Sequence, residues 1–196
     1  MLYMKRLSLI EQLLALFPER RHGVTIKHMP EKIIIKPWLS AVALLLIGLA
    51  VFMTGLANPF MGDDSAQIVD NVPVHSLTNI PAFFGESTFY DGHNQAHLTG
   101  IYYRPLMTTI YSVIYSIFGP QPIAFHVVQL LLGIGCAFML YLFLAYSVNS
   151  VLAFLAAVIF LVHPINSQTL FAIASMQDVL CFLFGMTALW LLLRFT

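Results

Sequence analysis

Charged residues are scarce in this sequence of 196 residues, in which nine Lys and Arg and nine Asp and Glu together make up 9% of the chain. Because their charges cancel, the chain has no overall basic field of the kind that nucleic-acid-binding proteins use, and we predict no nucleic-acid partner. Hydrophobic residues make up 59% of the chain, and the mean hydropathy is +0.84. This composition excludes an ordinary soluble domain and predicts a membrane protein.

Cysteines and the common catalytic motifs are equally rare. The two cysteines, Cys136 and Cys181, lie inside apolar stretches, where a thiol is usually a small hydrophobe, so no disulfide framework is implied. The sequence has no internal repeat, Gly-rich phosphate loop or low-complexity tract. His93 and His97 have the four-residue spacing of a helical metal site, but no Glu lies between them and an Asp-Gly pair just before them favours a loop.

The few charges are unevenly distributed. Seven of the nine bases precede the first apolar run, so the positive-inside rule places residues 1–37 in the cytoplasm. Residues 1–17 have apolar side chains at helical spacing, which indicates an amphipathic helix at the membrane surface or one packed on a partner domain, followed by a polar linker. Five acids lie between the first apolar run and Arg104 and therefore face the other side of the membrane: Asp63, Asp64, Asp70, Glu86 and Asp91.

Four apolar runs predict membrane spans at residues 38–57, 123–146, 151–162 and 179–195. The first is read as a retained anchor rather than a cleaved signal, and it is followed by an acidic loop, residues 58–122. Residues 106–118 are apolar but short, which favours a helix lying on the membrane surface; if they crossed instead, Asp178 would move to the cytoplasm. The predicted fold is therefore all-α and polytopic, with about four transmembrane helices and an amphipathic helix in a large first extracytoplasmic loop.

The acid pair Asp63-Asp64 is the first candidate site. Neighbouring carboxylates repel one another, which suits a poised base or a metal ligand, but an acid near a helix start also serves as a cap. Arg104 could hold a phosphate with its planar fork, or pair with one of the loop acids.

Three further polar residues lie near the ends of the predicted spans. His126 is either a polar contact at the membrane interface or a functional group, because ionisable residues at membrane depth are costly. His163 and Asp178 flank the stretch PINSQTLFAIASMQ, where a helix kink and an N-cap are the alternative to function.

Three features follow one another in the sequence: the acid pair, the stretch YYRPLMTTIYSVIYSIFGPQPIAFH and the stretch AAVIFLVHPINSQTLFAIASMQDVL. Together they resemble the membrane domain of C-type glycosyltransferases that use lipid-phosphate sugars. The similarity covers about residues 38–195 and is greatest to the transmembrane and tetratricopeptide-repeat (TMTC) O-mannosyltransferase branch. The resemblance implies that residues 38–196 form the N-terminal part of such a domain, within a larger enzyme.

The resemblance also implies roles for the candidate residues. Asp63 and Asp64 match the catalytic acidic motif, with Asp63 favoured as the essential carboxylate. The implied substrate-binding positions are Arg104, His126, His163 and Asp178. Gln168 and Gln177 depart from the acidic and basic residues that relatives tend to have there, which places charge around the donor phosphate in question.

The implied reaction is an inverting transfer of a hexose, such as mannose, from a polyprenyl- or dolichyl-phosphate sugar to a hydroxyl of an acceptor protein or glycan. No cofactor is firmly predicted, although oxygen ligands could hold Mg or Mn. The expected location is a bacterial inner membrane or the endoplasmic reticulum, among membrane lipids. A non-catalytic, truncated membrane subunit or scaffold of a larger glycosyltransferase is the main alternative. A transporter ranks third, because polar residues gather at span ends rather than at midspan.

Overall fold

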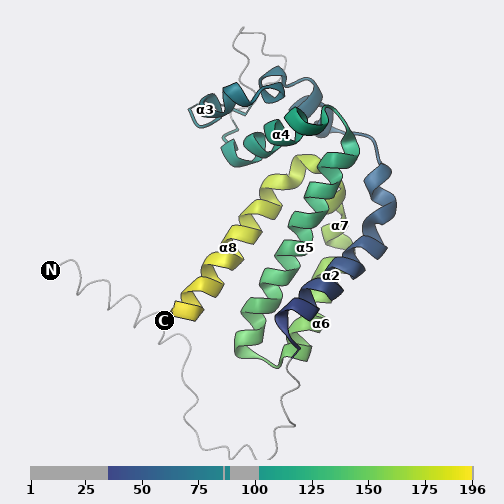
Figure 1. The fold of residues 1–196 in the computed structure, drawn as a ribbon, viewed down its shortest axis with the longest axis vertical. Coiled ribbons are helices and arrows are strands. Elements are labelled where there is room, and N and C mark those ends of the chain that lie inside the picture. The colour runs from purple at the N-terminus through teal and green to yellow at the C-terminus, as the bar shows by residue number, and fades with distance from the viewer. Residues whose placement is uncertain (1–34, 86, 89–101, 196) are drawn as a thin grey trace, which may run out of the picture. The chain divides into compact units, whose positions relative to one another are not determined.

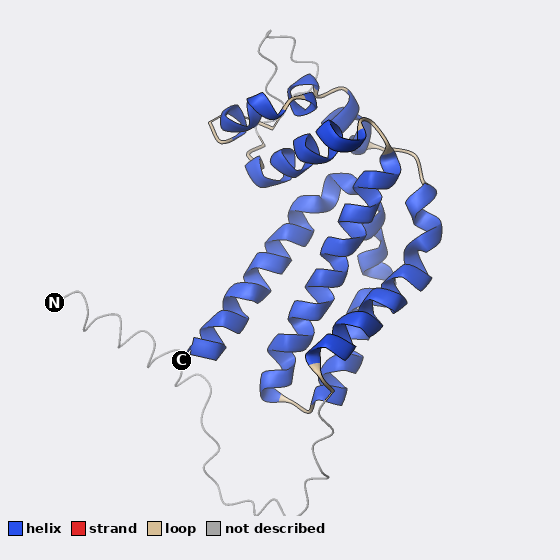
Figure 2. Ribbon diagram, viewed as in Figure 1, coloured by secondary structure: helices blue, strands red, loops and turns tan. Residues whose placement is uncertain are grey.

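The structure, a computed structural model, describes residues 35–85, 87–88 and 102–195, all of which belong to one compact unit, residues 33–196. Within the described residues every regular element is helical and no strand is found (Figure 2). The all-α prediction is therefore confirmed. The predicted amphipathic helix at residues 1–17, its linker and the pair His93 and His97 lie outside the described residues.

Among the residues that the structure describes, three helices are long and apolar enough to cross a membrane. Helix α2 (Pro37–Phe52) continues into the 3₁₀ helix η1 (Met53–Ala57), α5 covers Pro122–Ser147, and α8 (Met176–Phe195) follows the 3₁₀ turn η5 (Ile173–Ser175). The helices α6 (Ser150–Val162) and α7 (Pro164–Phe171) form a fourth candidate, bent by 58° between them. These lengths confirm a polytopic membrane protein.

The bend between α6 and α7 follows from Pro164, which cannot continue the backbone hydrogen bonds of a helix. His163 lies in extended conformation just before it, and its Nδ1 accepts a hydrogen bond from the Ile165 N–H at 3.2 Å. The Asn166 side chain donates to the Phe160 carbonyl at 2.7 Å, which satisfies an acceptor at the end of α6. Side chains thus replace the backbone bonds that the break removes.

Helix α5 packs against α2, α6 and α8, as Figure 1 shows. Small residues permit the close approach: Ala153 and Ala157 of α6 are fully buried, and Gly133 of α5 lies against Leu170. At the opposite end from the acidic loop, Ile35 is held by Tyr141 and Ser150, whose side chains bond its carbonyl and its N–H. The core of the bundle consists of Leu44, Phe52, Leu130, Ile134, Ala137, Tyr141, Ala153, Ala157, Leu161 and Leu170.

The described part of the acidic loop forms a layer of short helices over one end of the bundle. It contains the π-helical turn η2 (Ser65–Val69), the 3₁₀ turns η3 (Val72–His75) and η4 (Leu77–Asn79), α3 (Ile80–Phe83) and α4 (Pro105–Phe118). Helix α4 runs across the end at which α5 and α8 begin (Figure 1). A second core lies between this layer and the starts of α5 and α8, and it consists of Ile68, Val74, Met107, Tyr111, Ile114, Phe125, Ile173, Met176 and Leu180.

Candidate functional site

The acidic pair lies where this layer meets the turn before α8. Gly62 has a φ of +53°, a conformation that glycine adopts more readily than other residues. It allows a tight turn in which the Asp64 N–H donates a hydrogen bond to the Met61 carbonyl at 3.0 Å. The Asp64 carboxylate is fully buried. Its Oδ2 accepts from the Met61 N–H at 3.1 Å, and its Oδ1 accepts from the Ala174 N–H at 2.7 Å. Asp64 therefore connects the loop to η5, which lies 110 positions further along the chain.

The two acids have opposite environments. Asp63 is exposed, whereas no part of Asp64 reaches solvent. Although Asp64 occupies the N-cap position of η2, its side chain makes no capping hydrogen bond to that turn. Asp64 therefore does not cap this turn through its side chain, and Asp63 is the carboxylate of the pair that a dissolved molecule can reach.

Tyr111 of α4 holds the same turn from the other side. Its hydroxyl donates a hydrogen bond to the Ile173 carbonyl at 2.5 Å. The next residue, Ala174, carries the N–H from which Asp64 accepts a hydrogen bond. Burial and the nearby Asp64 carboxylate raise the pKa of Tyr111 well above its usual value, while Arg104 opposes that effect. The phenol thus stays protonated as a hydrogen-bond donor. Nothing in the sequence distinguished this residue from other apolar positions of α4.

Arg104 stands at the N-cap of α4 and is half-buried. Its guanidinium carbon lies 4.7 Å from the centre of the Tyr102 ring, within the range of a cation–π contact. The charges of Arg104 and Asp64 both act on the Tyr111 phenol, so both side chains lie near this residue of α4. The structure therefore brings Arg104 to the same end of the bundle as Asp63.

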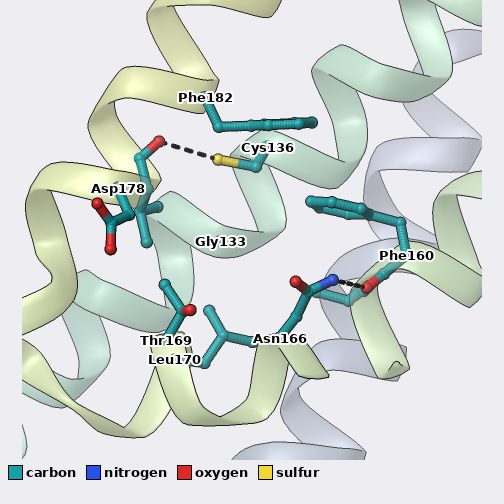
Figure 3. Close-up of a pocket in the computed structure, with 10 residues that line it drawn as sticks. Gly133, Cys136, Phe160, Asn166, Thr169, Leu170, Asp178 and Phe182 are labelled. Carbon is teal, nitrogen blue, oxygen red and sulfur yellow. Dashed lines mark hydrogen bonds between the residues drawn. The ribbon is translucent and has the colours of Figure 1, made fainter. Parts of the chain in front are cut away.

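Asp178 lies in the first turn of α8, where a carboxylate also favours the helix dipole. It follows Ala174, the partner of Asp64, by four positions, so the start of α8 and the acid pair share one end of the bundle. Asp178 is exposed and borders a cavity of about 210 Å³ between α5, α6, α7 and α8 (Figure 3).

The cavity is apolar over most of its wall. Phe160 and Phe182 stack with their ring centres 4.9 Å apart, and Cys136 donates from its thiol to the Val179 carbonyl at 3.3 Å. Asn166, Thr169 and Asp178 are its polar lining residues, and no base is among the lining residues: Gly133, Cys136, Phe160, Leu161, Asn166, Thr169, Leu170, Asp178, Val179 and Phe182. Sequence reasoning missed Asn166 and Thr169, because nothing local links them to Asp178.

The two histidines occupy different surroundings. His126 of α5 is buried and lines a small pocket together with residues of η1 and α7, and neither ring nitrogen has a partner among the described residues. His163 is exposed, and its ring caps α7, as the kink-and-cap alternative expects. Their role in substrate binding stays a prediction.

The part of the chain that the structure describes holds no group of three His, Cys, Asp or Glu side chains close enough to share a metal ion. Gln168 is exposed, and the Gln177 side-chain oxygen is buried without a partner among the same residues.

Comparison with known proteins finds two distant relatives. The chain is similar to human protein O-mannosyl-transferase TMTC4, with 24% identity over 177 residues, which are 80% of this chain and 23% of the relative. It is also similar to human protein O-mannosyl-transferase TMTC2, with 29% identity over 152 residues, 73% of this chain and 17% of the relative. The chain thus spans only about a fifth of the length of these relatives. No family model matches the chain. No solved structure matches it either.

Proposed function

We propose that this chain forms part of a membrane glycosyltransferase that moves a sugar, such as mannose, from a polyprenyl- or dolichyl-phosphate carrier to an acceptor hydroxyl. The observation that carries the proposal is the exposed Asp63 at an end of the bundle that also holds Arg104 and Asp178. The similarity to two protein O-mannosyl-transferases supports the same reaction class.

Asp63 would act as the general base. Its exposed carboxylate accepts the proton of the acceptor hydroxyl while the oxygen of that hydroxyl forms a bond to the anomeric carbon. The bond from the anomeric carbon to the phosphate oxygen breaks at the same time, and the lipid phosphate leaves with the electron pair. A single displacement of this kind inverts the configuration of the sugar.

Arg104 would hold the donor phosphate, because a guanidinium offers two parallel hydrogen bonds to phosphate oxygens. The cavity beside Asp178 is less suited to that group, since its lining has a carboxylate and no base. It better suits an apolar part of the acceptor, with Asp178 accepting a hydrogen bond from a hydroxyl. At about 210 Å³ the cavity exceeds the roughly 150 Å³ that holds a benzene molecule, so a side chain fits.

A divalent cation is not part of the proposed chemistry. A lipid monophosphate needs less charge neutralisation than a diphosphate, and Arg104 supplies a positive charge near the leaving group. Mg or Mn bound by carboxylate oxygens remains the alternative. Transfer that continues in EDTA supports the first reading, and transfer that stops and returns with either ion supports the second.

The proposal is tested with membranes that contain the full-length protein. Labelled polyprenyl- and dolichyl-phosphate sugars are supplied with a hydroxyl-bearing acceptor, and the same sugars attached to a nucleotide serve as the control. We expect transfer from the lipid phosphates alone. Transfer only from the nucleotide sugar would overturn the choice of donor.

A non-catalytic scaffold is the second candidate, favoured by Gln168 and Gln177, which are neutral where the resemblance implies an acidic and a basic residue. In that case the purified protein would transfer no sugar from either donor, but would co-purify with an active transferase.

A further inference from the structure

We propose that Asp64 is a positioning residue: its buried carboxylate connects the loop that carries Asp63 to the turn before α8, and so sets Asp63 relative to Asp178. The catalytic consequence rests on the proposed function. The connection itself does not, because it consists of contacts within the chain.

The bonding of Asp64 argues against a direct part in proton transfer. Each of its oxygens accepts a hydrogen bond from a backbone N–H, one from Met61 in its own turn and one from Ala174. Its side chain has no exposed surface through which a hydroxyl could approach. Hydrogen bonds from backbone N–H groups to a carboxylate are charge-assisted and strong, which suits a structural connection.

The connection is made at a point that controls the start of α8. Ile173 and Ala174 are consecutive residues of η5, and Tyr111 bonds the carbonyl of the first while Asp64 bonds the N–H of the second. Ile173 and Met176 are fully buried in the same core as Tyr111. The turn is therefore held by α4 and by the acidic loop together.

The position of Asp178 depends on this turn. It lies in the first turn of α8, which begins directly after η5, so a displacement of η5 moves its carboxylate. Asp63, the neighbour of Asp64 in the chain, moves when Asp64 loses its partners. A change of about 1 Å in such an arrangement is enough to lower a rate roughly 100-fold.

Conservative and truncating substitutions separate positioning from catalysis. Asn keeps one acceptor oxygen, and Ala keeps none. For a positioning Asp64, we expect Asp64→Asn to lose roughly tenfold in kcat and Asp64→Ala clearly more, because one or both hydrogen bonds disappear. For the base, Asp63→Asn and Asp63→Ala should be equally inactive, roughly 100-fold or more below wild type. Equal inactivity of the two Asp64 variants, with wild-type stability, would overturn the proposal.

Hydrogen–deuterium exchange of the full-length protein, without substrate, tests the connection independently of activity. The peptide containing Ala174 should exchange faster in Asp64→Asn and Asp64→Ala, whereas Asp63→Ala should leave it unchanged. Unchanged exchange in the Asp64 variants would overturn the connection. If the wild-type protein transfers no sugar but the exchange pattern is found, the proposed function fails and the connection stands.

Discussion

Gly55 lies between the first span and the acidic loop, where it packs closely against Phe171. It lies in η1, and a Cβ added there would be 1.9 Å from Cε1 and 2.5 Å from Cδ1 of Phe171. The ring would have to move by about 1.6 Å to reach an ordinary carbon contact. That ring also packs edge-on against Phe52, with centres 5.6 Å apart, so its movement disturbs the contact between α2 and α7.

We expect Gly55→Ala to destabilise the protein by about 1–2 kcal/mol, because overpacking costs about 1–3 kcal/mol and the gain in helix propensity offsets at most about 1 kcal/mol. The melting temperature should fall by roughly 2–8 °C. Gly185→Ala is the control, since nothing lies within 4 Å of a Cβ added there, and it should be neutral or stabilising.

The melting temperature can be followed with a thiol-reactive dye in detergent. Cys136 is buried and reacts only when the protein unfolds, whereas the exposed Cys181 is first replaced by Ser. If Gly55→Ala melts at or above the temperature of Gly185→Ala, the close packing of η1 on α7 is refuted.

Four further predictions concern the site. Tyr111→Phe should cost about 0.5–1.5 kcal/mol, because it removes one of the two hydrogen bonds that the Ile173 carbonyl accepts and leaves the one from the Met176 N–H, while Tyr115→Phe, whose ring stacks on a histidine, should cost less. Because the folded protein holds the pKa of Tyr111 above 10.0, its contribution to stability is present below pH 10.0 and is lost as the pH rises further; thermal unfolding of Tyr111→Phe should lack that loss. Arg104→Gln should raise the KM for the lipid-phosphate sugar roughly 10- to 100-fold, and the KM of Arg104→Lys should lie between those of the wild type and Arg104→Gln. An unchanged KM in Arg104→Gln would show that Arg104 does not bind the phosphate. Val179→Phe, which fills the cavity, should raise the acceptor KM several-fold and leave the donor KM unchanged, whereas Val127→Phe, on an exposed face of α5, should change neither.

The fold class was predictable, because a long charge-free apolar run can satisfy its backbone hydrogen bonds in a membrane only by forming a helix. Helix α4 begins at Pro105, one residue before the predicted start. Arg104-Pro105 marks the beginning of the apolar run, and Gly119 marks its end. The last helix begins at Met176 rather than Val179, since Asp178 lies within its first turn instead of before it. Local sequence signals of this kind carry most of the helical architecture.

The division of labour within the acid pair was not predictable from the sequence. It depends on the turn at Gly62 and on a hydrogen bond to Ala174, a partner 110 positions away. Asp63 and Asp64 are identical in type and adjacent, so no local pattern assigns burial to one of them. Tyr111 escaped notice for the same reason, because its partner Ile173 comes from a distant turn.

The central claim, that Asp63 is the base for sugar transfer from a lipid phosphate, is tested most directly by the initial rate of Asp63→Asn. Asp70→Asn is the matched control, because Asp70 is another exposed acid of the same loop. With saturating lipid-phosphate sugar, we expect the rate of Asp63→Asn to fall by roughly 100-fold or more while Asp70→Asn stays near wild type. Equal rates for Asp63→Asn and Asp70→Asn would contradict the account.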